Sequence, residues 1–206
     1  AVLVLVLSVS IGVPLGILSA VKQNSLMDTI PTMIAFFLAA VPSFVVGIVL
    51  MYIFALKLNW FPSFGLTSAK HYVLPVIAAT ICELSAYLRF TKSSMLESIR
   101  QDYVRTARAK GVAERTVIWK HALKNALLPV VTSIGMRFGC LLAGMVTTEK
   151  LFSIPGIGSL IVDSISLKDE PMIIGCAIMV SVCFTLLMIG VDLIYAFIDP
   201  RIRAKY

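Results

Sequence analysis

Two opposite charges, Glu83 and Arg137, lie deep inside apolar stretches of this chain. Glu83 is eleven residues into the stretch 72–90 and Arg137 eleven residues into the stretch 126–147, so both are expected near the middle of a membrane. A lone charge at that depth costs upward of about 2.5 kcal/mol, so such residues pair or face a watery cavity. They predict either a buried pair that fixes helix packing or a surface that meets the charged ends of a zwitterionic solute.

The second polar feature is the segment 97–125, the one long polar run in the chain. We expect two short helices broken at Gly111, outside the bilayer. Val104, Ala107 and Gly111 follow an i, i+3, i+7 spacing, which places small residues in one stripe of a helix. Beside that stripe lie Arg105, Arg108 and Arg115. This surface suits docking of a protein partner, although a solvated basic loop or a helix on anionic lipid has the same pattern.

Signatures of enzymatic chemistry are absent from the sequence. HExxH, GxSxG and GxxxxGK[ST] do not occur, and His71 and His121 fall in loops expected on opposite sides of the membrane. The four cysteines have no ligand spacing and are interpreted as buried apolar side chains. We therefore predict no catalytic residue and no metal site in this chain.

Composition assigns the fold class. With 59% hydrophobic residues, 14% charged residues and a mean hydropathy of +0.95, the chain is predicted to be an all-α integral membrane protein. Residues 1–206 form a single transmembrane domain in this interpretation. About five spanning helices are expected, at 1–21, 29–56, 72–90, 126–147 and 172–197. Pro42 lies inside the second and serves either as a packing kink or as a substrate contact.

The placement of charge predicts the orientation. Residues 97–124 carry seven Lys/Arg and three Asp/Glu, a net charge of +4, and Lys22, Arg201, Arg203 and Lys205 add to the same side. The loops expected on the other side balance four lysines against four acidic residues. Lys and Arg concentrate in cytoplasmic loops, so the polar segment is expected in the cytoplasm. The net charge of +7 therefore indicates membrane topology and not nucleic-acid binding.

The amino-acid sequence of the polar segment resembles that of a known family. Thr106-Ala107 followed by Gly111 is similar to the coupling loop of ATP-binding-cassette (ABC) importer permeases. The strings from Asp102 to Gly111 and from His121 to Pro129 resemble the dipeptide, oligopeptide and nickel branch. Arg105 and Thr106 stand where the general pattern has glutamate and alanine. Ala113 replaces a frequent serine, so the second short helix is expected to lack a side-chain cap.

The resemblance extends to both ends of the chain. A segment similar to the outer end of the family's pathway contains Glu149, Phe152, Pro155, Gly156 and Gly158. The ending, with Asp199-Pro200-Arg201, resembles the first of the two paired permease subunits. Members usually have an amino-terminal spanning helix and an extracytoplasmic segment before this region, and we expect the present sequence to lack them.

The resemblance implies the transmembrane domain of a type I ABC importer in the cytoplasmic (inner) membrane. Its partners would be a second homologous permease, two ATPase subunits, an extracytoplasmic substrate-binding protein and membrane lipid. This chain would bind no cofactor, while the ATPases would bind ATP and Mg²⁺. The residues expected to couple to the ATPases are Asp102, Tyr103, Arg105, Thr106, Ala107, Arg108, Ala109, Lys110, Gly111 and Glu114. Glu83, Arg137 and Pro42 are candidates for the translocation path.

Family members carry peptides, glutathione, opine-like metal chelates or nickel, and the substrate of this chain stays open. An ion-coupled secondary transporter is the alternative function. Such carriers commonly have inverted repeats and intramembrane ion sites, whereas the conspicuous polar element of this sequence lies outside the spans. A membrane-embedded enzyme is disfavoured by the missing catalytic signatures.

Overall fold

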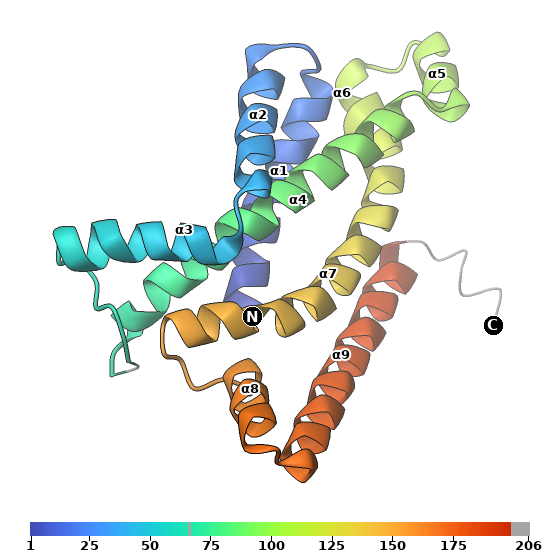
Figure 1. The fold of residues 1–206 in the computed structure, drawn as a ribbon. Helices are drawn as coiled ribbons and strands as arrows, with labels where there is room; N and C mark the ends of the chain where they lie inside the picture. Colours follow the sequence, from blue (N-terminus) through green and yellow to red (C-terminus); the bar gives the residue numbers. More distant parts are fainter. Residues whose placement is uncertain (66, 199–206) are drawn as a thin grey trace.

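The computed structural model describes residues 1–65 and 67–198. The described residues form helices joined by short turns, and none of them forms a strand (Figure 1). The tail beginning at Asp199, on which the resemblance to the first permease subunit partly rests, lies outside them. By length and composition four helical stretches of the described part can cross a membrane, Val2–Val21, Ala69–Ile99, Glu114–Leu142 and Glu170–Val191.

Helix α4 (Val73–Ile99) is the centre of the fold and packs against α1 (Val2–Val21), α2 (Leu26–Ala40) and α7 (Leu123–Leu151). Small residues allow α1 and α4 to pack closely. A Cβ atom at Gly16 would lie 2.6 Å from the Leu88 carbonyl oxygen and 2.7 Å from Thr91 Cβ. Close backbone approach through small residues is a common way for helices to associate in lipid.

The apolar stretch 29–56 is not one tilted helix. Helix α2 ends at Ala40, and α3 (Ser43–Leu50) continues as a π-helix over Met51–Lys57. The two halves meet at an angle of 97°, so they are either one broken crossing or a re-entrant loop (Figure 1). The cause is Pro42, which has no N–H to donate and forces the preceding Val41 into an extended conformation.

Helices around the polar segment are longer than the spans expected from hydropathy. α4 continues to Ile99, nine residues past the expected limit at 90, because Met95 is buried against Ile118 and Ala126. The second short helix of the segment is not separate. α6 (Glu114–Thr116) runs through a π-helical turn, Val117–Ala122, directly into α7.

The end opposite the polar segment is closed by α8 (Ile157–Leu167), which connects α7 to α9 (Glu170–Ile198) and packs against both. Figure 1 shows α8 and α9 forming one side of the molecule, with α3 extending from the other. Many apolar side chains of α9 are exposed, among them Ile174, Ile178 and Leu186. The described residues thus form an all-helical fold of membrane-spanning length, with apolar outer surfaces suited to lipid or to a second membrane subunit.

Candidate functional site

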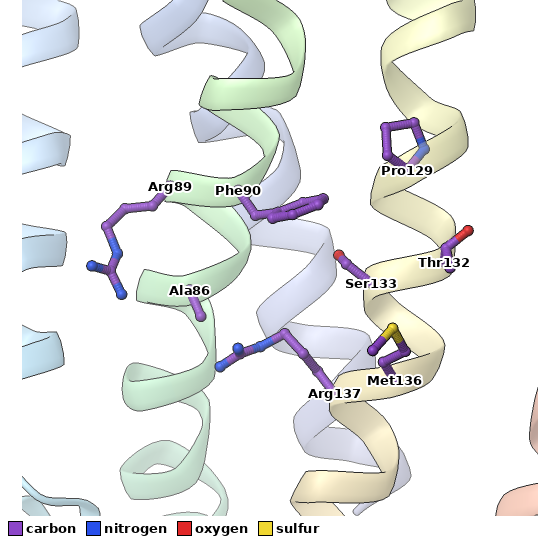
Figure 2. A pocket seen from close by; sticks show the side chains of 8 residues that line it. All are labelled: Ala86, Arg89, Phe90, Pro129, Thr132, Ser133, Met136 and Arg137. Carbon is purple, nitrogen blue, oxygen red and sulfur yellow. The ribbon is translucent and has the colours of Figure 1, made fainter.

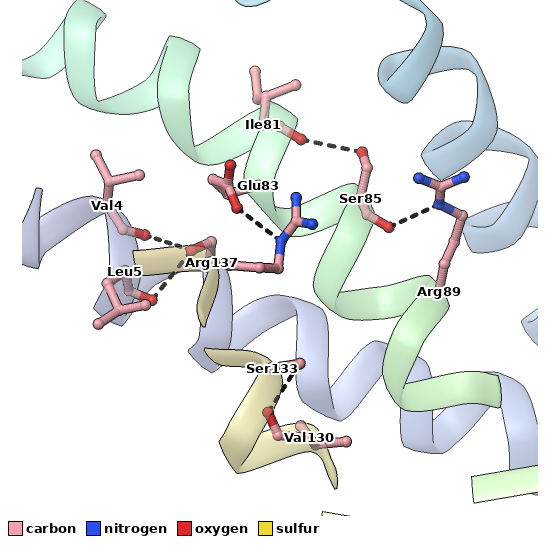
Figure 3. Close-up of polar contacts among 10 residues, drawn as sticks. Val4, Leu5, Ile81, Glu83, Ser85, Arg89, Val130, Ser133 and Arg137 are labelled. Atoms are coloured by element: carbon pink, nitrogen blue, oxygen red, sulfur yellow. Dashed lines mark hydrogen bonds and ion pairs between the residues drawn. The ribbon is translucent and has the colours of Figure 1, made fainter. Parts of the chain in front are cut away.

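Glu83 and Arg137 are joined in the structure. Arg137 Nε donates a hydrogen bond of 3.1 Å to Glu83 Oε2, which links α7 to α4 (Figure 3). The Arg137 guanidinium also lies over the Tyr87 ring, 5.7 Å from its centroid. The pair is not sealed off, because 40% of the Arg137 side chain and 18% of the Glu83 side chain remain exposed. The geometry therefore includes the ion pair that the sequence suggested, with the guanidinium still accessible.

An open groove of about 780 Å³ lies between α4 and α7 on one side of this pair (Figure 2). Its polar lining includes Thr132 and Ser133 of α7, and Figure 2 shows Arg137 extending from α7 toward α4. Pro129 and Phe90 line the end of the groove that is nearer the polar segment. A volume of this size fits a small organic solute.

A smaller pocket of about 300 Å³ lies farther along α7, toward Met145 and Thr148. Val41 and Ser43 contribute to its wall, so the break at Pro42 lies beside the pocket. Non-helical backbone is tolerated at membrane depth only where protein or a water-filled cavity covers it. The break in α2 and α3 therefore agrees with a polar cavity at this position.

Arg137 stands at the junction of the groove and the pocket. Arg137, Arg89 and Ala86 line both cavities, and Glu83 lines only the pocket. Arg89 lies on the other side of α4 in Figure 2, where its guanidinium is 5.3 Å from the centroid of the Phe36 ring. Together the cavities follow α7 from Pro129 to Thr148. Their charged lining side chains are Arg89, Arg137 and Glu83, so the surface is positive overall.

Small residues of the polar segment face inward and not toward a partner. Val104 is fully buried and Ala107 is 8% exposed, and both pack against Val117 and Ala122 of the same chain. The predicted docking stripe is therefore largely internal, because the turn after α5 (Asp102–Ala109) folds this helix back onto the start of the helix leading into α7. This helical hairpin, residues 102–122, exposes its charged side.

The exposed side of the hairpin is held by Arg108 and Glu114. Arg108 Nε and Nη2 donate to the two Glu114 carboxylate oxygens at 3.0 and 2.7 Å, a forked pair across the turn. These hydrogen bonds raise the pKa of Arg108 above its ordinary value. Gly111 lies at the turn with φ +71°, and nothing is within 4 Å of where its Cβ would be. Thr106 donates to the Asp102 carbonyl at 2.9 Å, which stabilises α5 locally.

The remaining predicted coupling residues lie on the same hairpin. Asp102, Arg105, Thr106, Ala109, Lys110 and Gly111 are exposed, and Tyr103 is 40% exposed. Asp102 and Arg105 approach within 3.6 Å, but 97% of the Asp102 side chain and 76% of the Arg105 side chain are exposed. No side chain caps α6 at Ala113, as the missing serine predicted. The hairpin therefore offers a partner a compact, charged, mostly basic surface.

Two serines of α4 were missed by the sequence analysis: Ser98 joins the hairpin to α4, and Ser94 joins α4 to α7. Ser98 Oγ donates to the Ala122 carbonyl at 2.7 Å and accepts the Tyr103 hydroxyl at 2.7 Å. Ser94 Oγ donates to the Ala126 carbonyl at 2.7 Å. Their i, i+4 spacing just beyond the expected end of a span was the available signal. α4, α5 and the start of α7 are thereby linked around Ser98.

The structure places the residues of the predicted outer segment at the end of α7 and in the turn that leads into α8. Ser159 N–H donates to Glu149 Oε2 at 2.8 Å, so the carboxylate lies at the amino-terminal end of α8. A Cβ at Gly156 would be 2.2 Å from the Glu149 carboxylate, so glycine is needed for this approach. Phe152 is buried against Met51, Ala55 and Leu74. Pro155 lies in the turn between α7 and α8.

Several long apolar helices, an open groove between two of them and a charged hairpin at one end are the features of a multi-pass membrane transport component. Residues 12–204 match the family of binding-protein-dependent transport system inner membrane components. The chain belongs to this family, whose members are inner-membrane proteins.

Named relatives are glutathione transport system permease proteins GsiC. The chain is 42% identical to that of Salmonella choleraesuis (strain SC-B67) over 198 residues, which cover 96% of this chain and 65% of the relative. It is 40% identical to that of Escherichia coli (strain K12) over 201 residues, which cover 98% of this chain and 66% of the relative. The chain thus spans about two thirds of the length of these relatives.

Proposed function

We propose that this chain is the membrane-spanning permease subunit of an ATP-driven importer for peptides or related small solutes. It would form the translocation path with a second, similar permease, and each would dock a cytoplasmic hairpin onto an ATPase subunit. The ATPases would bind and hydrolyse ATP with Mg²⁺, and an extracytoplasmic binding protein would deliver the substrate. Family membership supports the transport class, and the relatives named for glutathione transport favour a peptide-like cargo over nickel or a metal chelate.

The observation that carries this proposal is the linkage of the exposed hairpin to both groove helices. Ser98 contacts Tyr103 of the hairpin and Ala122 at the start of the helix leading into α7, while itself belonging to α4. Movement of the hairpin would therefore be transmitted to α4 and α7, whose facing surfaces form the groove. A docked ATPase that moves the hairpin would change the width of the path.

The path itself would follow the two cavities along α7. Glu83 and Arg137 lie between α4 and α7, and the break at Pro42 adjoins the smaller cavity. In this proposal the second permease would supply the opposite wall. The exposed apolar faces of α2, α3 and α9 would contact that subunit or lipid.

Co-purification in mild detergent tests the assembly. The tagged wild-type chain is expected to carry a second permease and ATPase subunits, identified by mass. Gly111→Arg should lose the ATPases and keep the second permease, because a long charged side chain would protrude from the hairpin. Gly111→Asn is the matched control, since asparagine adopts positive φ more readily than other side chains. Loss of the ATPases in both variants would indicate that a partner approaches the Gly111 backbone directly.

An ion-coupled secondary transporter is the competing function. Purification of the wild-type chain without any ATPase, under conditions that preserve membrane complexes, would contradict the importer proposal. Uptake that depends on a proton or sodium gradient and continues without ATP would then support the secondary carrier.

A further inference from the structure

Arg137 has binding capacity that its ion pair does not use. Only Nε bonds Glu83, and the two terminal nitrogens have no hydrogen-bond partner among the residues whose side chains the structure describes. The terminal edge of a guanidinium presents two parallel N–H donors, which match the two oxygens of a carboxylate. With 40% of the side chain exposed at the junction of the groove and the pocket, these donors are accessible to a solute.

The charge balance of the site favours an anion. Glu83 neutralises one positive charge, and Arg89 supplies a second guanidinium that lines both cavities. A positive surface in a partly enclosed cavity raises the local concentration of anions. A neutral or cationic solute would gain nothing from this excess charge.

We infer that the junction binds a carboxylate of an acidic, peptide-like solute through the terminal nitrogens of Arg137, with Arg89 adding a second positive charge. This inference rests on the proposed transport function and specifies its substrate class. Because Glu83 uses only Nε, the ion pair between α4 and α7 would persist while the solute carboxylate is bound.

Cys140 provides a reporter beside this site, because it is exposed and lines the same pocket as Glu83 and Arg137. The experiment uses the assembled complex with Cys140 as the only cysteine of this chain, after Cys82→Ala, Cys176→Ala and Cys183→Ala. Its rates of modification by an anionic sulfonatoethyl and a cationic trimethylammonium-ethyl methanethiosulfonate are compared with those of a free small thiol. The anionic reagent should be favoured over the small-thiol reference.

Substitutions at Arg137 then test the source of this preference. Arg137→Gln should lower the ratio of anionic to cationic rates by about tenfold, as expected for loss of one nearby charge in a hydrated site. Arg137→Lys should retain most of the preference for the anionic reagent, because it keeps the positive charge. A loss in Arg137→Gln that Arg137→Lys does not share would then result from charge and not from misfolding. A ratio that Arg137→Gln leaves unchanged would overturn the inference.

Ligand protection completes the test. An acidic tripeptide should slow modification of Cys140 by a neutral reagent, while its uncharged carboxamide analogue should not, and Arg137→Gln should abolish the difference. Equal protection by both peptides, or by neither, would overturn the inference while the importer proposal still stands. If neither charged reagent reaches Cys140, the pocket is not on an aqueous path, and that part of the proposed function fails together with the inference.

Discussion

Asp28 and Lys92 form an ion pair of 2.5 Å that ties the start of α2 to α4. The Asp28 carboxylate also accepts hydrogen bonds of 3.1 Å from the Asn24 backbone N–H and the Thr32 hydroxyl. Only 7% of the Asp28 side chain and 20% of the Lys92 side chain are exposed. The turn between α1 and α2 is thus anchored to the central helix by buried charge.

Removing one partner of this pair should lower the free energy of unfolding more than removing both partners. Asp28→Asn leaves the Lys92 ammonium poorly solvated and unpaired, and we expect a loss of about 3 kcal/mol in unfolding free energy. Asp28→Asn combined with Lys92→Met should recover most of that loss. Unfolding midpoints of the purified chain in one detergent measure both effects. A double variant as unstable as the single one would show that the pair is not the cause.

Close packing of α1 on α4 predicts that alanine substitutions at two glycines have very different effects on stability. Gly16→Ala would press a methyl group against the Leu88 carbonyl and Thr91, and we expect a destabilisation of about 1–3 kcal/mol. Gly175→Ala in α9 is the control, because nothing lies within 4 Å of its Cβ position. It should be neutral or slightly stabilising in the same unfolding measurement. Similar losses at both positions would contradict the packing argument.

The forked pair between Arg108 and Glu114 should hold the hairpin turn. Glu114→Gln removes an exposed ion pair of about 0.5 kcal/mol, so amide hydrogen exchange across residues 109–114 should accelerate roughly twofold at low salt. High salt should shrink the difference, because exposed charges are screened. Asp102→Asn is the control, since its 3.6 Å contact with Arg105 is solvated. Equal acceleration in both variants would argue against a special role for Glu114.

The same pair predicts a flat response to moderately alkaline pH. The hydrogen bonds from Arg108 to Glu114 raise the arginine pKa, so this contribution is complete below the unfolded-state value. It is lost only as the pH rises through the raised folded-state value. Hydrogen exchange of the turn, corrected for its intrinsic pH dependence, should therefore not change between pH 7 and pH 9. A change in that window would have to come from another group.

Ser98 should couple ATP hydrolysis to transport. Ser98→Ala removes the side-chain donor to the Ala122 carbonyl and the side-chain acceptor of Tyr103, at an expected cost of about 1 kcal/mol in stability. The ratio of substrate transported to ATP hydrolysed, measured in reconstituted vesicles, should fall. Ser181→Ala is the control, because that hydroxyl only bonds the Ala177 carbonyl of its own exposed helix. An unchanged ratio in Ser98→Ala would contradict the proposed linkage.

Much of the architecture could be predicted from local patterns. Long apolar stretches predict helices because backbone groups in lipid must be satisfied within the segment, and Pro42 predicts a bend. The size of that bend depends on how α3 packs on the end of α7. At Gly47, for example, a Cβ would lie 2.6 Å from a Leu151 methyl carbon. Hydropathy carries no information about such a contact.

The site was only partly predictable, because it too depends on how the helices pack against one another. Glu83 and Arg137 are equally deep in oppositely directed stretches, so a pairing could be expected although 54 residues separate them. The inward orientation of Val104 and Ala107 could not, because a small-residue stripe suits a neighbouring chain and the chain's own hairpin equally well. The serine bonds to Ala122 and Ala126 depend on how α4 crosses α7, which the i, i+4 spacing of Ser94 and Ser98 does not give.

The pairing of Glu83 with Arg137 also constrains how the protein can be made. Both charges belong to one chain, but α4 is synthesised well before α7, so Glu83 has no partner when its helix first leaves the ribosome. We therefore expect the insertion machinery to retain α4, or to leave it near water, until α7 arrives. The two helices would then enter the lipid together with their charges already neutralised, before any second subunit is needed.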